Sequence, residues 1–382
     1  PPEQFNLAPG GVYYFDLSGV SIPDTVNDAL PDNTLHYVPF TYAGTVDAYK
    51  LTSEMATTEE YAETYKYAHS LFVADYAVTY AASWDHLNAI DMIFGKDYTA
   101  GGVDYTMRAP SEGSDYTGSG DSERGTPQSN EWDRLLDKDD GYIKNWNGIF
   151  SCGQDTVIRL PGRRTVRGHY SSRFCGHRDA AGQNPQVGFR PVLEVLNRDT
   201  IGPDGLKTVT LDLGGGKLGD ESSIRIIVKN GSEFTAPASD GLTRPDGNTD
   251  SYFMWLGSNG KLYAPGDNVP ADVTKLTAQF ALSEQFSLTP GGRYYFDLSA
   301  MNIPGTANGG NSVGAASLPD TSLHYVPFTY VGTIEAYKLT SATATTEEYA
   351  QQNKYPHSLF VADYAVTHTI SWGGLNDEGL IF

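Results

Sequence analysis

Residues 188–195 are Gly-Phe-Arg-Pro-Val-Leu-Glu-Val, the most informative stretch in this chain. With the flanking residues Val187 and Leu196, the stretch is rich in β-branched and aromatic side chains, a composition typical of strands. We therefore expect residues 187–196 to form the terminal strand of a domain.

The segment before that strand reverses the charge of the chain. The whole sequence has a formal net charge of −21 and a pI near 4.6. Residues 159–190 nevertheless contain a single acidic residue, Asp179, and seven arginines, at positions 159, 163, 164, 167, 173, 178 and 190. We expect Arg167 and Arg190 to pair with buried carboxylates in the core.

The remainder of this segment has the composition of a binding surface. Aromatic rings supply contact area, arginines supply forked hydrogen bonds, and small polar side chains adapt to a ligand. A plain structural loop is the alternative interpretation. The candidate ligand-binding residues are His169, Tyr170, Ser172, Arg173, Phe174, Cys175, Gly176, His177, Arg178, Asp179, Gln183 and Gln186.

The sequence predicts an α+β domain over residues 1–200. Aromatic and β-branched residues favour strands at 13–17 and 35–51. The Gly-, Ser- and Asp-rich residues 100–127 favour a long loop. Helices are expected to begin at three capping residues, namely Thr57, Ser83 and Ser129.

A small β module is predicted for residues 204–282. Short strands are expected at 208–213, 224–228 and 276–280, separated by turns rich in Gly, Pro and Asn. The glycines at 214–216 are not a phosphate-binding loop, because no Gly-Lys-Ser/Thr follows them at the required spacing.

Residues 283–382 repeat the beginning of the chain. The repeated blocks are 4–5 and 285–286, 13–18 and 294–299, 35–40 and 323–328, and 70–76 and 358–364. The second copy stops at Ile381-Phe382, which match Ile93-Phe94, and so it corresponds to the front half of a second domain. The chain is cut there, or this half folds alone, or a neighbour completes it. We expect its uncovered strand edges to promote self-association.

Composition excludes several classes of partner. An acidic surface repels nucleic acid and anionic lipid, and no run approaches the roughly 18 apolar residues that span a bilayer. The only cysteines, Cys152 and Cys175, are too few for a disulfide scaffold, and a bridge between them stays open.

Three motifs of the first domain belong together. They are Tyr-Thr-Met-Arg-Ala-Pro at 105–110 with Asn-Glu-Trp-Asp at 130–133, Val-Arg-Gly at 166–168, and Gly-Phe-Arg-Pro-Val-Leu-Glu at 188–194. In this order they resemble the C-type-lectin-like fold in its sulfatase-modifying-factor, or formylglycine-generating, branch. The same ending is typical of variable proteins served by diversity-generating retroelements, where the residues before Gly-Phe-Arg vary to change ligand specificity. By that resemblance, residues 169–186 form a variable binding surface.

The β module carries a pattern of its own. Val-Thr-Leu-Asp-Leu-Gly-Gly-Gly at 209–216 is followed by Trp-Leu at 255–256 and Leu-Thr-Ala-Gln-Phe at 276–280. This pattern resembles the Listeria–Bacteroides-type surface B-repeat, a β-grasp-like module. Such repeats act as spacers in cell-surface proteins.

These features indicate an extracellular ligand-binding or adhesion protein from a Gram-positive bacterium or its phage, on a cell or virion surface. Its expected partner is a protein or glycan, with no nucleic acid and no membrane insertion. A fibre-forming repeat protein, assembled by strand or domain complementation, is the alternative. An oxidase of the formylglycine-generating type comes third, because only Cys175 lies where that family uses cysteines. We expect no catalytic residues, no cofactor and no metal site, since the acidic turn at 137–141 is a poor calcium loop.

Overall fold

We describe the protein from a computed structural model. The residues that it describes are 1–47, 67–113, 130–136, 141–157, 160–195, 201–249, 252–310, 316–335 and 355–381. The chain divides into two compact units, Pro1–Thr249 with Phe253–Ala278, and Asp250–Tyr252 with Gln279–Phe382. The first unit thus contains both the predicted first domain and most of the predicted β module, and the second contains the repeated segment.

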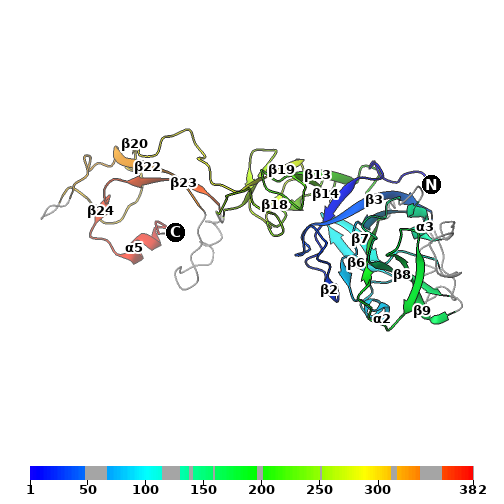
Figure 1. Ribbon diagram of the computed structural model, residues 1–382. Helices are drawn as coiled ribbons and strands as arrows, with labels where there is room; N and C mark the ends of the chain where they lie inside the picture. Colours follow the sequence, from blue (N-terminus) through cyan, green and yellow to red (C-terminus); the bar gives the residue numbers. More distant parts are fainter. Residues whose placement is uncertain are drawn as a thin grey trace. The chain divides into compact units, whose positions relative to one another are not determined.

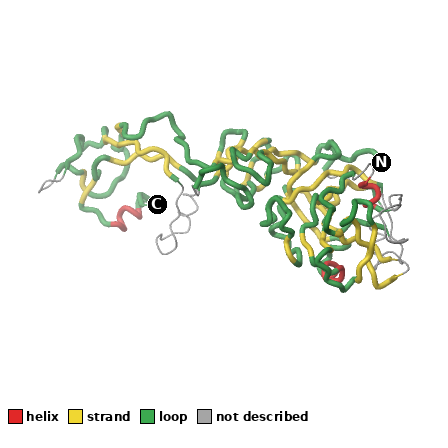
Figure 2. Tube along the Cα trace, viewed as in Figure 1, coloured by secondary structure: helices red, strands yellow, loops and turns green. Residues whose placement is uncertain are grey.

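Strands dominate both units, and the predicted α+β class is wrong. Of the residues that the structure describes, 39% lie in strands and 6% in helices. The helical part consists of three short segments (Figure 2), which are α2 (Trp84–Ala89), α3 (Glu131–Leu136) and α5 (Trp372–Asp377). None of the helices in the described ranges is long and apolar enough to cross a membrane.

One expected helix start lies within the described residues, and it is confirmed. Ser83 caps α2 as expected, because its side chain accepts a hydrogen bond from His86 N (3.2 Å). Soon after the helix ends, Asp91 adopts a positive φ of 66°, which no right-handed helix contains. A capping residue marks where a helix begins and carries no information about where it ends. The expected starts at Thr57 and Ser129 lie outside the described residues, and Asn130 accepts a hydrogen bond from Asp133 N (2.9 Å) at the start of α3.

The first unit contains two six-stranded sheets (Figure 1). The first sheet has the order β1 (Val12–Phe15), β3 (Val38–Val46), β4 (His69–Ala74), β12 (Val192–Val195), β7 (Val103–Arg108) and β6 (Lys96–Ala100). The second has the order β10 (Cys175–Asp179), β9 (Leu160–Gly168), β8 (Phe150–Val157), β11 (Val187–Phe189), β5 (Thr79–Tyr80) and β2 (Thr25–Val26). Strand β7 lies inside residues 100–127, so the long loop expected there is wrong for its first part.

The stretch at 187–195 forms two strands and not the single one expected. Strand β11 pairs with β8 and β5 in the second sheet, whereas β12 pairs with β4 and β7 in the first. Arg190 and Pro191 lie between them, and proline has no N–H to continue a ladder. The stretch therefore joins the two sheets of the unit.

Aromatic side chains fill the core of this unit. Phe15 meets Phe72 and Tyr105 edge to face, with ring centroids 5.3 and 5.5 Å apart, and all three are buried. They belong to the cluster that also contains Phe150 and Phe189 of the second sheet. Burying one such side chain contributes roughly 1.5–3 kcal/mol.

The β module of the first unit packs on the first sheet. Its own sheet has the order β14 (Ser223–Lys229), β13 (Leu206–Asp212), β19 (Lys275–Gln279), β16 (Met254–Gly257) and β17 (Leu262–Tyr263), beside the pair β15 (Phe234–Thr235) and β18 (Asn268–Val269). The Arg225 guanidinium lies 4.7 Å over the Tyr13 ring, and the Tyr37 hydroxyl donates to Ala238 O. The predicted strands at 208–213, 224–228 and 276–280 correspond to β13, β14 and β19.

The second unit repeats the front half of the first. Its strands are β20 (Arg293–Phe296), β22 (Val326–Ile334) and β23 (His357–Ala362), with the pair β21 (Thr306–Ala307) and β24 (Thr367–His368). They pair as β1, β3 and β4 do, and a bulge between Tyr330 and Gly332 matches the one between Tyr42 and Gly44.

Candidate ligand-binding face

Strands β9 and β10 form the hairpin that carries most of the predicted site. Cys175 lies opposite Arg167, and Arg178 lies opposite Arg164. Successive side chains of a strand point to opposite faces. The candidates on β10 therefore divide between two faces, with Gly176 and Arg178 on one and Cys175, His177 and Asp179 on the other.

Aromatic rings gather on the face that carries Arg178. The His169 ring stacks on buried Phe150, with centroids 4.4 Å apart and 17° between the ring planes. Tyr170 and Phe174 meet edge to face at 4.9 Å, and the Arg178 guanidinium lies 4.5 Å over the Phe150 ring. We call His169, Tyr170, Phe174 and Arg178, with Phe150 beneath them, the aromatic edge.

The backbone of the aromatic edge is held in an unusual conformation. Gly168 and His169 have positive φ values of 93° and 71°, and for a non-glycine residue this costs about 1–2 kcal/mol. Hydrogen bonds offset that cost: His169 N donates to Trp146 O (2.8 Å), and Gly148 N donates to His169 O (3.0 Å). The turn projects Tyr170, which is 66% exposed, from a fixed position.

The opposite face of the hairpin carries a charged group. Arg163 Nε pairs with Asp179 Oδ1 (3.0 Å), and Arg163 Nη1 lies 2.9 Å from His177 Nδ1. Partial burial, together with Arg163 and Arg178, lowers the pKa of His177. The imidazole is therefore neutral at neutral pH, and its Nδ1 accepts from Arg163. We call Arg163, His177 and Asp179 the charged edge.

The predicted residues thus occupy three kinds of position. The exposed ones are Tyr170, Asp179, Gln183 and Gln186, and the half-buried ones are His169, Arg173, Phe174, His177 and Arg178. Ser172, Cys175 and Gly176 are buried, so their expected place on an exposed surface is wrong. Strand alternation directs Cys175 into the interior, a detail that composition alone does not contain.

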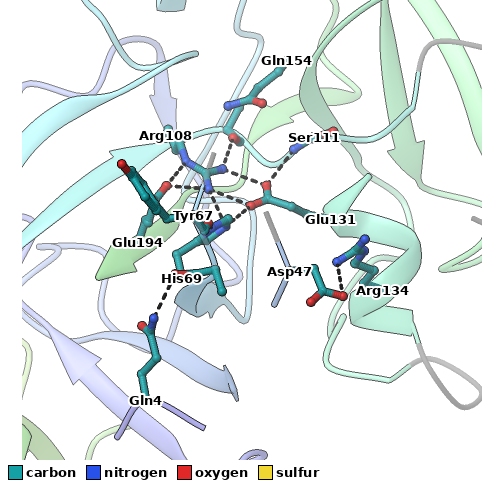
Figure 3. Close-up of polar contacts among 12 residues, drawn as sticks. Gln4, Asp47, Tyr67, His69, Arg108, Ser111, Glu131, Arg134, Gln154 and Glu194 are labelled. Atoms are coloured by element: carbon teal, nitrogen blue, oxygen red, sulfur yellow. Dashed lines mark hydrogen bonds and ion pairs between the residues drawn. The ribbon is translucent and has the colours of Figure 1, made fainter. Parts of the chain in front are cut away.

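A buried ion-pair network joins β4, β7, β12 and α3 (Figure 3). Arg108 Nη2 contacts Glu131 Oε1 and Glu194 Oε2, both at 2.7 Å, and His69 Nε2 lies 2.9 Å from Glu131 Oε1. Burial alone would raise the pKa of Glu131, but Arg108 and His69 hold it well below its ordinary value. Because every charge has a partner, the network fixes Glu131 at the start of α3.

Helix α3 transmits this fixed position to the hairpin. Trp132 Nε1 donates to Ser172 O (2.9 Å), and Asp133 Oδ1 pairs with Arg167 Nη2 (2.8 Å). The same Arg167 nitrogen also donates to Arg173 O (3.3 Å). The hairpin backbone beside the aromatic edge is therefore tied to the core.

We did not predict this network, although the sequence contained a signal for it. Arg108, Glu131 and Glu194 each stand inside a motif quoted above, next to apolar residues. Charged residues are almost never fully buried unless they are paired. An arginine and two glutamates in two of these motifs would have been sufficient to suggest mutual pairing.

The two arginines expected in the core are both buried, with different partners. Arg167 pairs with Asp133, which confirms the expectation for that residue. For Arg190 the expected carboxylate partner is wrong: it donates to Ser151 Oγ (2.9 Å) and to carbonyl oxygens of Ala74 and Asn145. Burial lowers the pKa of Arg190 to about 10, so it remains charged at neutral pH.

Both cysteines are buried, and no disulfide joins them. Cys152 lies opposite Val166 on β9, and Cys175 lies opposite Arg167 on the same strand. Burial raises the pKa of the Cys152 thiol, so the reactive thiolate is disfavoured there.

Two hollows, of about 590 and 650 Å3, lie between the first sheet and the β module. No residue of the aromatic edge lines either of them. These two hollows are therefore separate from the aromatic edge.

Comparison with known proteins identifies no relative of this chain. No family model, no curated protein and no solved structure matches the chain.

Proposed function

We propose that the protein binds a macromolecular ligand through the aromatic edge. The observation that carries the proposal is Tyr170, a large aromatic side chain that is 66% exposed and yet packs edge to face with His169 and Phe174. An exposed aromatic residue with fixed neighbours loses little conformational entropy when it binds. Tyr and Arg are also the residue types that dominate binding energy at interfaces.

The polar and charged side chains around the aromatic edge are suited to hydrogen bonds with a ligand. Arg173 and Arg178 are half-buried, and Gln183 and Gln186 are exposed. Gln186 adjoins Phe150, whose N–H donates to the Gln186 carbonyl (2.7 Å). Arginine and amide groups offer hydrogen bonds to the hydroxyl groups of a glycan or to the backbone of a protein.

The proposed setting is the exterior of a cell or virion, with adhesion as the role. Support comes from the repeated modules and from the resemblance of the β module to surface spacers. Binding is favoured over thiol oxidation because both cysteines are buried.

Arrays of glycans and of extracellular proteins, probed with the full chain, test the proposal. For a captured ligand, Tyr170→Ser should weaken binding at least tenfold, or about 1.4 kcal/mol, and leave the melting temperature unchanged within a few degrees. Tyr67→Ser is the matched control, since Tyr67 is 42% exposed and lies outside the aromatic edge. Equal loss of binding in both variants, or no loss in either, would reject the aromatic edge as the contact surface.

A further inference from the structure

One hexapeptide of this chain occurs in two different surroundings. His-Ser-Leu-Phe-Val-Ala forms β4 in the first unit and β23 in the second. Every residue of β4 is buried, whereas the residues of β23 are half-buried or exposed. Val73 is 0% exposed and its counterpart Val361 is 50% exposed.

Greater exposure is also found on β20 and α5 of the second unit, although Val326 and Tyr330 of β22 remain buried. Phe296 is 39% exposed where Phe15 is 3% exposed, and Trp372 is 53% exposed where Trp84 is 4% exposed. The strand pairing is nevertheless the same in both units. The second unit therefore presents the same sheet without its cover.

The first unit identifies the cover. Strand β12 pairs antiparallel with the outer edge of β4, with Val192 opposite Val73 and Leu193 opposite Phe72. On the face of the sheet, Tyr105 of β7 packs on Phe15, and α3 supplies the Glu131 that pairs with His69. All these covering residues lie within 96–195.

A second copy of this chain is a poor source of that cover. Residues 1–382 contain two front sheets and one covering segment. An exchange of residues 96–195 between copies would cover the second-unit sheet only by uncovering a first-unit sheet. The number of uncovered sheets would stay the same, so swapping the segment between copies would bury no additional apolar surface.

We propose that the open sheet of the second unit binds a polypeptide segment of the same pattern as residues 96–195, additional to the one within residues 1–382. A strand of the β12 type would pair antiparallel with the edge of β23 that no described strand occupies, and place its apolar residues beside Phe360. A glutamate in the position of Glu131 would pair with His357, which occupies the place of His69. Unpaired strand edges and exposed apolar faces are the features that such a segment covers.

Hydrogen–deuterium exchange tests this with an internal reference. The two hexapeptides are identical, and their peptides differ in mass through the residues that follow, such as Tyr80 and His368. In the full chain, residues 357–362 should exchange at least about tenfold faster than residues 69–74. Exchange at 357–362 that slows as protein concentration rises would show that copies cover one another, and it would overturn the proposal.

A tandem chain, with a second copy of residues 95–195 after Phe382, supplies the segment directly. Residues 357–362 should then exchange within about threefold of residues 69–74. The control tandem carries Leu193→Lys in the added copy only, and its exchange at 357–362 should stay fast. Equal slowing in the control would show that any added chain suffices, against the proposal.

A synthetic peptide of residues 187–195 provides a second measurement that does not depend on folding of the tandem. It should slow exchange at 357–362 and leave 69–74 unchanged, because β12 already occupies the edge of β4. No slowing with either the tandem chain or the peptide would overturn the proposal.

Discussion

Glu112 places a carboxyl group where solvent does not reach it. A Cβ atom added to Gly153 would come within 2.4 Å of Glu112 Oε2, so the two residues are in tight contact. Neither carboxyl oxygen has a hydrogen-bond partner within the part of the chain that the structure describes. Burial raises the pKa of Glu112 well above its ordinary value of 4.5, although Arg167 acts in the opposite direction. The folded protein therefore keeps this proton at pH values where the unfolded chain releases it.

We predict that the free energy of unfolding of Glu112→Gln rises relative to that of the wild type as the pH increases from about 5 to 8. With its folded pKa raised, Glu112 makes the wild-type free energy of unfolding fall as pH rises from 4.5 to the folded pKa. The amide has no proton to release and lacks this decline. The difference between the two proteins should grow by up to about 1.4 kcal/mol per pH unit, as measured by urea unfolding.

Asp179→Asn is the control for this titration. Asp179 is exposed on the charged edge, and an exposed ion pair contributes about 0–1 kcal/mol. Its unfolding free energy should stay within about 1 kcal/mol of that of the wild type over the same pH range. Parallel curves for Glu112→Gln and the wild type would mean that Glu112 is ionised in the folded protein.

At the scale of single elements, α3 is the link between the core network and the aromatic edge. The helix has six residues, four of which are buried. Its Trp132 reaches the hairpin through one hydrogen bond to Ser172 O. The position of the turn that carries Tyr170 therefore depends on a helix outside the aromatic edge.

We predict that Trp132→Phe loosens the aromatic edge without altering its side chains. The substitution leaves the buried Ser172 carbonyl without its donor, at a cost of about 1–3 kcal/mol. Amide exchange over residues 168–175 should accelerate, and ligand affinity should fall by about three- to tenfold through loss of preorganisation. Exchange mass spectrometry and titration of an array-identified ligand measure the two effects.

Trp255→Phe provides a chemically matched control in the β module. Trp255 is buried, and its Nε1 donates to Pro237 O (2.8 Å). Its replacement removes the same type of hydrogen bond and should lower stability comparably. Exchange at 168–175 and ligand affinity should not change. Loss of affinity in both variants would attribute the effect to global destabilisation.

The strands also show which parts of the fold could be predicted from the sequence. Aromatic and β-branched residues located β1, β13 and the beginning of β3 to within a few residues, because these side chains favour strands. The predicted end of the 35–51 strand lies outside the described residues. The division of 187–195 between two sheets was not predictable, since both halves have the same strand composition and their partners lie far away in sequence. For the candidate site, composition indicated a segment whose side chains range from exposed to buried, and the burial of Cys175 depended on the register between β9 and β10.

At the scale of the whole molecule, the duplication allows two similar sequences to be compared within one chain. The front sheets of the two units share strand order and register, and they differ in what covers them. The stability that the cover contributes can therefore be measured by making the same substitution in each unit.

We predict that Trp84→Ala is costly and that Trp372→Ala is not. Trp84 is buried, donates to Gly153 O (3.0 Å) and lies under the Arg164 guanidinium (4.2 Å), so its loss should cost the first unit about 3–5 kcal/mol. Trp372 is 53% exposed, and its loss should cost the second unit less than about 1 kcal/mol. Hydrogen–deuterium exchange at increasing urea concentration measures the stability of each unit separately, through residues 69–74 in the first and residues 357–362 in the second. Comparable costs in the two units would show that the second sheet is already covered in the isolated chain.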